Sequence, residues 1–377
     1  MSDVYNCEAK VLSPIHIGSG EKYTASEYVQ AKVKTKKGTI LNTAKRIDVS
    51  RYYMDLDENK KDEFLRDLSN PNFDLGSFDK KISNNFMRYR VINKSKSEIS
   101  PNQEITESIK TLDKSYVPGS SIKGAIKSAI LYGLIDDDAV DTIEHKILRN
   151  NGRVQNREYT NFLSDIFSTR SIRNSAQADI MKFLQVTDSS TIKSPYIYDI
   201  LTVMAAFRKG HHEYYSRNRN TRTPTLSFLE TIPAGSKLTF DIINGYSKLV
   251  HKRNFENKKN LIDIDNIKKS IFIFSKSLIN NELEFADDYG IDTLYKFYNK
   301  IEKINSIDNP LLKVGAGSGY LATTVNLKIK KYDSYLYNKI ADGTRGKNYE
   351  YEFPKSRKIT QNGGKPLGWI QLSFKES

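Results

Sequence analysis

The sequence predicts an α+β protein built from two domains. Its 377 residues are more than one hydrophobic core usually serves. Each half reads as strands, then helices, and then a glycine-containing turn that enters a helix. The expected division lies near residue 188, so that domain 1–188 carries a polar helical insertion over about 140–172 and domain 189–377 follows it.

The chain is strongly basic. Lysine and arginine total 59 against 45 aspartate and glutamate residues, which gives a net charge of +14. This excess favours a polyanionic partner, either nucleic acid or an anionic membrane. No apolar run approaches a membrane span and the N-terminus lacks the apolar core of a signal peptide, so we expect a cytoplasmic protein with no membrane partner. Cys7 is the only cysteine, which excludes an internal disulfide and cysteine-rich zinc modules.

A glycine-rich loop is expected near the N-terminus. Residues Cys7–Ile17 alternate as a strand does, and the chain then runs through Gly18, Ser19 and Gly20 to Lys22. Two glycines one residue apart let a backbone bend sharply and approach a ligand closely. The spacing from the first glycine to the lysine is not that of a Walker A loop.

His16 stands at the end of this strand, beside the glycines. An imidazole titrates near neutral pH, so His16 is the one residue that suits general acid or base chemistry. The alternative is a histidine that packs and hydrogen-bonds inside the fold. The other histidines are scattered, and neither an H-E-x-x-H motif nor a nucleophile elbow occurs, so we expect no metal and no cofactor.

The stretch Tyr116–Leu131 reads as a turn that becomes a helix. Its apolar residues recur at helical spacing, and the helix is expected to end near Ile135. Ser120 or Ser121 is the expected N-cap, because a serine hydroxyl can accept from the first free backbone amides.

Two lysines give this helix a possible second function. Lys123 and Lys127 lie four residues apart and share one face. With the turn at Gly119 and the serine hydroxyls, they would form a cradle for a phosphate at the helix N-terminus. The alternative is an ordinary amphipathic core helix with solvated lysines.

The most basic and aromatic passage covers residues 208–222. It interleaves arginines and tyrosines in a stretch that reads as a flexible loop, where they could pair with phosphates and stack on exposed bases. The alternative is a solvated hairpin. The cations predicted to contact nucleic acid in this passage are Arg208, Lys209, Arg217 and Arg219.

A second glycine-rich turn contains Gly315, Gly317 and Gly319. It follows a short apolar stretch and leads into a helical segment. The third glycine comes one residue too soon for a dinucleotide-binding fingerprint. Residues Pro366–Phe374 then read as a turn and a closing strand.

Four stretches together resemble the repeat-associated mysterious proteins (RAMPs) of CRISPR systems, most closely the fifth Csm subunit of type III-A effector complexes. They are, in chain order, Pro14–Tyr23, Tyr116–Lys127, Phe183–Asp188, and Val314–Tyr320 with Pro366–Trp369. Their order and separation run the length of the chain. Two positions depart from the family: Lys127 stands where relatives often have arginine, and Ala316 where a bulkier aromatic is common.

The resemblance implies two ferredoxin-like domains of the RNA-recognition-motif type, with glycine loops over the sheet face or its edge. It also implies a non-catalytic RNA-binding subunit that caps the backbone filament at the 3′ end of the crRNA and supports crRNA maturation. The implied partners are the 3′ region of the crRNA, the duplex with target RNA, the Csm backbone subunit, the small subunit and host trimming nucleases.

A guide's spacer varies, so the residues that hold it are expected to grip phosphates and sugars without reading sequence. The predicted RNA contacts are His16, Gly18, Ser19, Gly20, Lys22, Gly119, Ser120, Ser121, Lys123, Lys127, Arg208, Lys209, Arg217, Arg219, Gly315, Gly317 and Gly319. One open alternative is a metal-independent RAMP endoribonuclease that processes crRNA precursor, with His16 as acid or base and Lys123 as electrostatic stabiliser. Another is the equivalent subunit of a type III-B complex.

Overall fold

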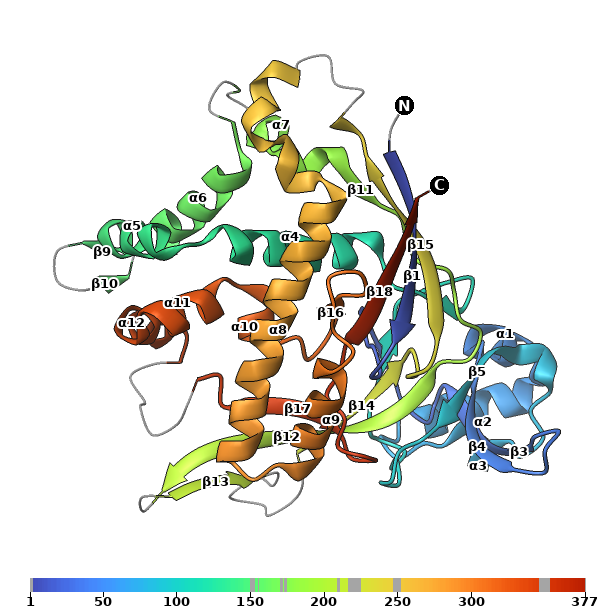
Figure 1. The fold of residues 1–377 in the computed structure, drawn as a ribbon. Coiled ribbons are helices and arrows are strands. Elements are labelled where there is room, and N and C mark those ends of the chain that lie inside the picture. Colours follow the sequence, from blue (N-terminus) through green and yellow to red (C-terminus); the bar gives the residue numbers. More distant parts are fainter. Residues whose placement is uncertain are drawn as a thin grey trace.

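The computed structural model describes residues 3–149, 153–154, 156–169, 172, 175–208, 211–215, 225–246, 252–345 and 353–376. The protein is a mixed α+β structure, which confirms the expected class. Two large sheets organise it, and long helices cover one face of the first sheet (Figure 1). None of the helices in these ranges is long and apolar enough to cross a bilayer.

The first sheet has five strands in the order β11-β15-β1-β18-β16. All neighbouring strands in it are antiparallel. At its centre, Cys7 lies opposite Phe240 on one side and Phe374 on the other. The strands are β1 Asp3–Val11, β11 Leu184–Val186, β15 Lys237–Asn244, β16 Leu311–Lys313 and β18 Trp369–Glu376.

One face of this sheet is buried under helices α4, Gly119–Leu134, and α8, Ile264–Asp288. Cys7, Ala9 and Val11 alternate along β1 and are all buried, because successive side chains of a strand point to opposite faces. Polar side chains line the opposite face. Of the helices that the structure describes, none lies over this face in Figure 1.

The elements β1, α4, β11, β15, α8 and β18 follow one another in the β-α-β-β-α-β order of a ferredoxin-like unit. Because β1 pairs with β18 in antiparallel register, with Tyr5 opposite Glu376, the two chain ends lie side by side (Figure 1). The division into two ferredoxin-like domains stays a prediction.

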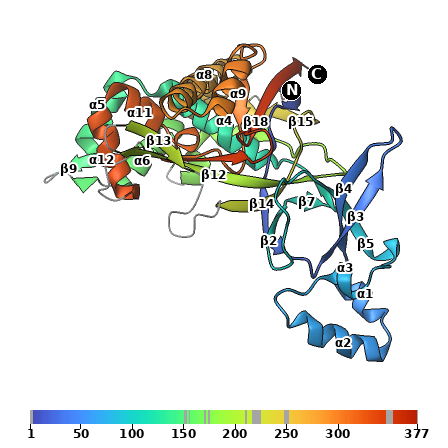
Figure 2. The ribbon, with the colours of Figure 1, turned by 90° about the horizontal axis from the view of Figure 1, so that it is seen from below.

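The second sheet has nine strands. Seven of them follow the order β2-β6-β14-β12-β5-β4-β3, and β13 and β17 also pair with β12. Figure 2 shows strands β2 to β5 set apart from the helical layer of the first sheet. The strands are β2 Gly18–Tyr23, β3 Tyr28–Lys34, β4 Ile40–Ile47, β5 Met87–Asn93, β6 Ile105–Ser108, β12 Tyr196–Arg208, β13 His211–Tyr215, β14 Leu226–Thr231 and β17 Ser356–Thr360.

Three short helices pack around Phe64 and Leu75 beside this second sheet: α1 Val49–Met54, α2 Glu58–Leu68 and α3 Leu75–Phe78.

The expected helical insertion contains α5, α6 and the hairpin β9-β10. The remaining elements are η1 Asn84–Phe86, β7 Lys110–Thr111, β8 Lys114–Ser115, α5 Asp137–Ile147, β9 Leu148–Arg149, β10 Arg153–Val154, α6 Asn156–Phe167, α7 Ser175–Ala178, η2 Ile180–Phe183, η4 Lys252–Ile262, α9 Asp292–Glu302, α10 Tyr320–Thr323, α11 Asn326–Tyr332 and α12 Ser334–Arg345.

Both large sheets draw strands from either side of residue 188. Strand β1 lies between β15 and β18, and β6 pairs in parallel with β14. The expected division at residue 188 therefore does not separate the sheets. Hydrophobic periodicity reports only local structure, so it gives no information about pairing over such distances.

Two local expectations near the N-terminus are wrong. Strand β1 ends at Val11 and does not continue to Ile17. The expected glycine loop is itself a strand, β2, at the edge of the second sheet. The sheet accommodates Gly20, whose φ is +96°, through an irregular register between Gly18 and Lys22.

The expected cap of α4 is also wrong, although the helix ends at Leu134, with Ile135 as its C-cap, close to the predicted end. Its N-cap is Pro118, which makes no side-chain cap bond, and Ser120 and Ser121 lie within the first turn. The amide of Gly119 instead donates to Oδ1 of Asp188 at 2.8 Å. A carboxylate from the segment after β11 thus replaces the predicted serine cap.

Candidate nucleic-acid interface

The segment after β1 packs directly against the second glycine turn. The N–H of Ala316 donates to the carbonyl oxygen of His16 at 2.8 Å. Gly315 has a φ of +76°, and a Cβ at this position would lie 2.5 Å from the same oxygen, so this close approach requires glycine. Two regions that the sequence predicts to contact RNA, about three hundred residues apart, therefore lie side by side.

His16 itself lies inside the fold. Its side chain is buried, and the Nδ1–H group donates to the carbonyl oxygen of Glu230 at 2.6 Å. Burial lowers the pKa of His16, although the contact with Glu230 opposes this effect. The imidazole is therefore neutral near pH 7, and its burial and its hydrogen bond to Glu230 favour the packing role.

Strand β2 presents an exposed edge. Gly18, Ser19, Gly20 and Lys22 are all exposed on it. An edge strand shows backbone N–H and C=O groups that no neighbouring strand uses. The ammonium of Lys22 lies 2.5 Å from Glu104, in a pair whose side chains are 54% and 56% exposed. Such a pair is weak in water, so Lys22 can exchange this partner for a phosphate.

Inside the second sheet lies a polar cluster centred on Glu230, which was not predicted from the sequence. Glu230 is fully buried. Its Oε1 accepts from the hydroxyls of Tyr23 at 2.7 Å and Tyr89 at 3.0 Å. Its Oε2 accepts from the N–H of Ser108 at 3.2 Å and from the ammonium of Lys110. These donors satisfy both oxygens of the buried carboxylate.

The tyrosines of this cluster stay protonated. Burial, and then the charge of Glu230, raises the pKa of both Tyr23 and Tyr89 well above the ordinary value. The guanidinium of Arg46 lies 3.9 Å from the centre of the Tyr23 ring and 3.4 Å from Glu107, and so extends the cluster. One signal in the sequence was available: a single carboxylate stands inside the apolar strand L-S-F-L-E-T.

The predicted phosphate cradle at the N-terminus of α4 is only partly exposed to solvent. Gly119 is buried, and a Cβ there would lie 2.1 Å from the carbonyl oxygen of Val186. This glycine therefore serves the close approach of α4 to the segment after β11. Ser120 is exposed and Ser121 is half-buried in the first turn.

The two lysines of α4 face α7 and its surroundings. Lys127 pairs with Asp179 at 2.8 Å and lies 4.7 Å from the centre of the Phe167 ring. Lys123 has no ion pair within the described part of the chain. Burial lowers the pKa of Lys123. The charge of Asp179 opposes this shift, and the charge of Lys127 reinforces it. Ala125 faces β16 and α10, so these lysines and the glycine turn lie on different sides of α4.

The basic passage 208–222 is described only at its start. Arg208 ends β12, which pairs with β13, so the passage begins as a hairpin and not as a loop. Lys209, Arg217 and Arg219 lie outside the described residues, as does the side chain of Arg208. Their contacts with RNA stay predictions.

The second glycine turn borders a small pocket of about 250 Å³. Gly317 has a φ of +77° and packs on Leu367, where a Cβ would lie 3.2 Å from the side chain. Gly319 has a φ of +81° and is exposed immediately before α10. Charged side chains from β16, α8 and β17 line the pocket beneath this turn, and the sequence analysis named none of them.

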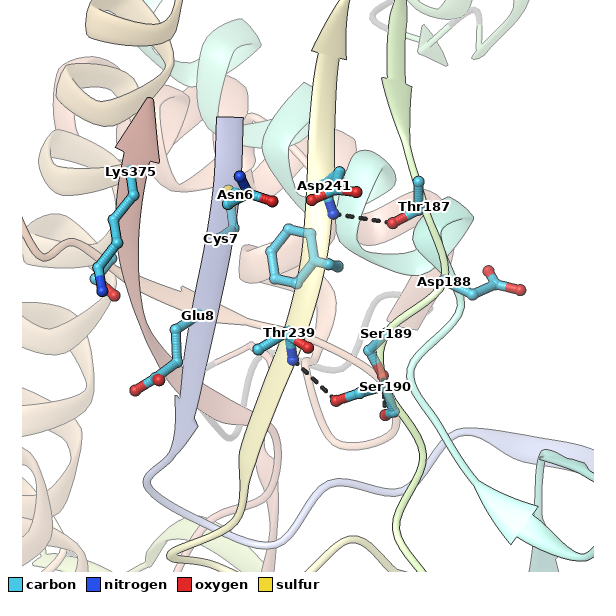
Figure 3. A pocket seen from close by; sticks show the side chains of 12 residues that line it. Asn6, Cys7, Glu8, Thr187, Asp188, Ser189, Ser190, Thr239, Asp241 and Lys375 are labelled. Carbon is cyan, nitrogen blue, oxygen red and sulfur yellow. Dashed lines mark hydrogen bonds between the residues drawn. The ribbon is translucent and has the colours of Figure 1, made fainter. Parts of the chain in front are cut away.

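A larger hollow of about 550 Å³ lies on the uncovered face of the first sheet (Figure 3). Glu8, Asp188 and Asp241 line it, against a single lysine, Lys375. Thr187 Oγ1 accepts from the N–H of Asp241 at 2.9 Å and holds the edge of the hollow in place. None of the predicted contact residues lines this hollow, and its carboxylates disfavour a polyanion.

Comparisons with known proteins agree with this architecture. A model of the RAMP superfamily matches residues 8–322. The CRISPR system Cms protein Csm5 of Methanocaldococcus jannaschii is 24% identical to this chain over 401 residues, which cover 98% of this chain and 88% of that protein.

Two solved structures share the fold. One is a chain in a cryo-EM structure of a Csm-crRNA-target RNA ternary complex in a type III-A CRISPR-Cas system, with a TM-score of 0.70, 24% identity, and coverage of 99% of this chain and 100% of that chain. The other is the crystal structure of T. onnurineus Csm5, with a TM-score of 0.63, 20% identity, and coverage of 96% and 99%. Because the family model spans most of the sequence, the chain belongs to the RAMP superfamily.

Proposed function

We propose that this chain is a non-catalytic RNA-binding subunit of a cytoplasmic type III-A CRISPR (Csm) effector complex. It caps the backbone filament at the 3′ end of the crRNA and supports crRNA maturation. Its partners are the crRNA, the duplex with target RNA, the backbone and small subunits, and the nucleases that trim the crRNA. Similarity to Csm5 along nearly the whole chain supports this role.

One observation carries the RNA-binding part of the proposal: the second glycine turn packs on the carbonyl of His16. This packing places Gly315 against His16 and Ile17, which lead directly into the exposed strand β2. Backbone amides at such glycines can approach phosphates closely and grip RNA of any sequence. The net charge of +14 supplies the attraction that this mode of binding needs.

The α4 lysines are the proposed RNA-binding residues whose removal is easiest to interpret. Replacing both Lys123 and Lys127 by alanine should weaken binding to unrelated RNA sequences alike. It should also reduce the slope of log K against log salt by about 0.7 for each phosphate of single-stranded RNA that the variant no longer neutralises. Fluorescence anisotropy with two labelled RNAs at several salt concentrations measures both effects.

A matched control removes the same charge elsewhere. Lys10 and Lys375 are exposed, and Lys375 lines the acidic hollow of the first sheet. Their double alanine variant should bind RNA nearly as the wild-type chain does. Equal decreases in affinity in the two double variants would mean that net charge alone decides binding. An unchanged affinity and salt slope in a folded α4 variant would rule out RNA binding by the α4 lysines.

A further inference from the structure

The pocket beneath the second glycine turn contains more positive than negative charge. Lys313, Arg357 and Lys358 line it, against one carboxylate, Glu282. Arg357 and Glu282 are both buried, and Nε of Arg357 lies 3.0 and 2.7 Å from the two carboxylate oxygens. Although burial alone would raise the pKa of Glu282, the charges of Arg357 and Lys313 lower it, so the carboxylate stays ionised. This pair cancels one charge of each sign and leaves two ammonium groups uncompensated in the pocket.

Lys313 is the group that most needs an anion. Its side chain comes from β16, is 9% exposed, and lines the pocket. Within the described ranges its ammonium makes no hydrogen bond and no ion pair, and it lies 5.6 Å from the centre of the Trp369 ring. Burial lowers the pKa of Lys313 to about 8, although the attraction of Glu282 opposes this shift. A buried ammonium with unused donors is costly, and a ligand with several acceptor oxygens removes that cost.

Glycine backbone forms the rim of the pocket. Gly317, Ser318 and Gly319 line it, and both glycines have positive φ. The hydroxyl of Ser318 donates to the carbonyl oxygen of Gly315 at 2.7 Å, which fixes the shape of the turn. Among the residues that the structure describes, no acceptor is bound to the N–H of Gly317 or Gly319. Free amides at such a turn add to the attraction for an anion.

Size and charge together select the kind of anion. A volume of about 250 Å³ is below the range of about 300–1,000 Å³ in which whole small molecules bind. The pocket therefore suits one chemical group of a larger ligand. A terminal phosphate carries a charge of about −1.5 to −2 near pH 7, which matches two uncompensated ammonium groups, whereas a carboxylate would match one.

We infer that this pocket binds one phosphate group, held by Lys313, Lys358 and the amides of the glycine turn. The inference rests on the proposed RNA-binding function for the source of that phosphate. The charge match favours a phosphate at the end of an RNA chain over one within it, which carries a single negative charge, and competition between RNAs with different ends separates the two.

The chain carries its own reporter of the pocket, since Trp369 is the only tryptophan and lines it. Inorganic phosphate is titrated into the full chain at constant ionic strength, with chloride as the balancing anion, and tryptophan fluorescence is followed. The wild-type chain should show a saturable change. Lys313→Gln should weaken the fitted affinity by about tenfold or more, because the variant cannot make the buried charge-assisted hydrogen bond to the phosphate.

Two further variants make the titration decisive. Lys358→Gln removes an exposed lysine of the pocket and should weaken the affinity several-fold without disturbing the fold. Lys10→Gln removes an exposed lysine of β1 outside the pocket and should leave the affinity unchanged. If Lys313→Gln does not fold, Lys358→Gln decides, and an unchanged affinity in that variant overturns the inference. So does a wild-type chain without a saturable response to phosphate, or a folded Lys313→Gln variant that binds phosphate as tightly as the wild type.

The source of the phosphate follows from RNA competitors of one sequence that end in 3′-phosphate, 5′-phosphate or hydroxyl. If one phosphorylated end competes best, and Lys313→Gln abolishes that preference, the pocket takes a terminal phosphate. If all three compete equally and Lys313→Gln weakens all three, it takes an internal one. RNA binding by anisotropy without any response to phosphate would overturn this inference and leave the proposed function standing. A phosphate response without RNA binding would overturn the proposed function and leave this inference standing.

Discussion

Two buried clusters of charge differ in how completely the protein pairs them. Around Glu230, two tyrosine hydroxyls, a backbone N–H and a lysine satisfy both carboxylate oxygens. Around Glu282, Arg357 binds both oxygens, and Lys313 is left without a hydrogen-bond partner among the described residues. The first cluster is closed within the second sheet, whereas the second opens onto a pocket. Removing one partner of an internally paired charge destabilises the fold, whereas an unpaired charge at a pocket indicates a ligand.

The largest expected effect comes from Glu230→Gln. Both oxygens of Glu230 accept hydrogen bonds, so an amide must turn its NH₂ group toward donors whichever way it is oriented. The variant also leaves the buried Lys110 with weaker compensation. We expect a loss of about 3–5 kcal/mol in the free energy of unfolding, measured by chemical denaturation. A loss below about 1 kcal/mol would show that the closed cluster does not depend on its charge.

The next largest effect is the change in the free energy of unfolding with pH that Lys313 causes. Its pKa is about 8 in the folded chain against an ordinary value of 10.5. Below pH 8 both states hold the proton, so the folded state bears the full cost of the buried charge. Between these two values the folded state loses the proton first, and the free energy of unfolding rises with pH. The whole rise is on the order of 3 kcal/mol.

Lys313→Met tests this assignment. The variant should be more stable than the wild-type chain below pH 8, and the gap should narrow as the pH rises toward 10.5, because only the wild type has the buried ammonium. Phosphate should narrow the gap near pH 7 as well, since it binds the wild-type pocket more tightly than the pocket of the variant. Denaturation curves of both proteins across this pH range, with and without phosphate, give the result. A gap independent of pH would show that Lys313 is not a costly charge.

The smallest effect is expected at the exposed pair of Lys22 and Glu104. Both side chains are more than half exposed, at 54% and 56%, so water screens their attraction. Glu104→Gln should change the free energy of unfolding by no more than about 0.5 kcal/mol, measured in the same denaturation assay as Glu230→Gln. A change above about 1 kcal/mol would remove the contrast between buried and exposed pairs.

The elements of this fold follow from the sequence better than their pairing does. Helix α4 ends at Leu134, close to the end near Ile135 that its periodicity predicts, and the closing strand lies at Trp369–Glu376. The position of β1 between β15 and β18 is not visible in any local pattern, because strand pairing depends on the packing of the whole chain. The edge strand β2 resembles a loop in the sequence because its glycines mask the strand pattern.

For the candidate interface too, the sequence predicts local features but not which residues come together. The sequence identifies Gly315 as part of a special turn, but only the structure shows that the turn packs on the carbonyl of His16. Lys313 and Glu230 each interrupt an apolar strand, which is a signal of a buried charge. The sequence does not say which residue pairs with each, and that pairing decides whether the charge stabilises the fold or binds a ligand.

The pairing of β1 with β18 also has a consequence for synthesis. In this register Val11 faces Ile370, so a central strand of the first sheet acquires one of its two neighbours only after the roughly 360 residues between these two positions have been made. At ribosomal rates of about 5–20 residues per second, that delay is on the order of tens of seconds. Until β15, Lys237–Asn244, has been made, β1 has neither of these neighbours. From then until β18 is made, β1 can pair only with β15, and the side where β18 belongs is an open strand edge that other nascent chains could occupy.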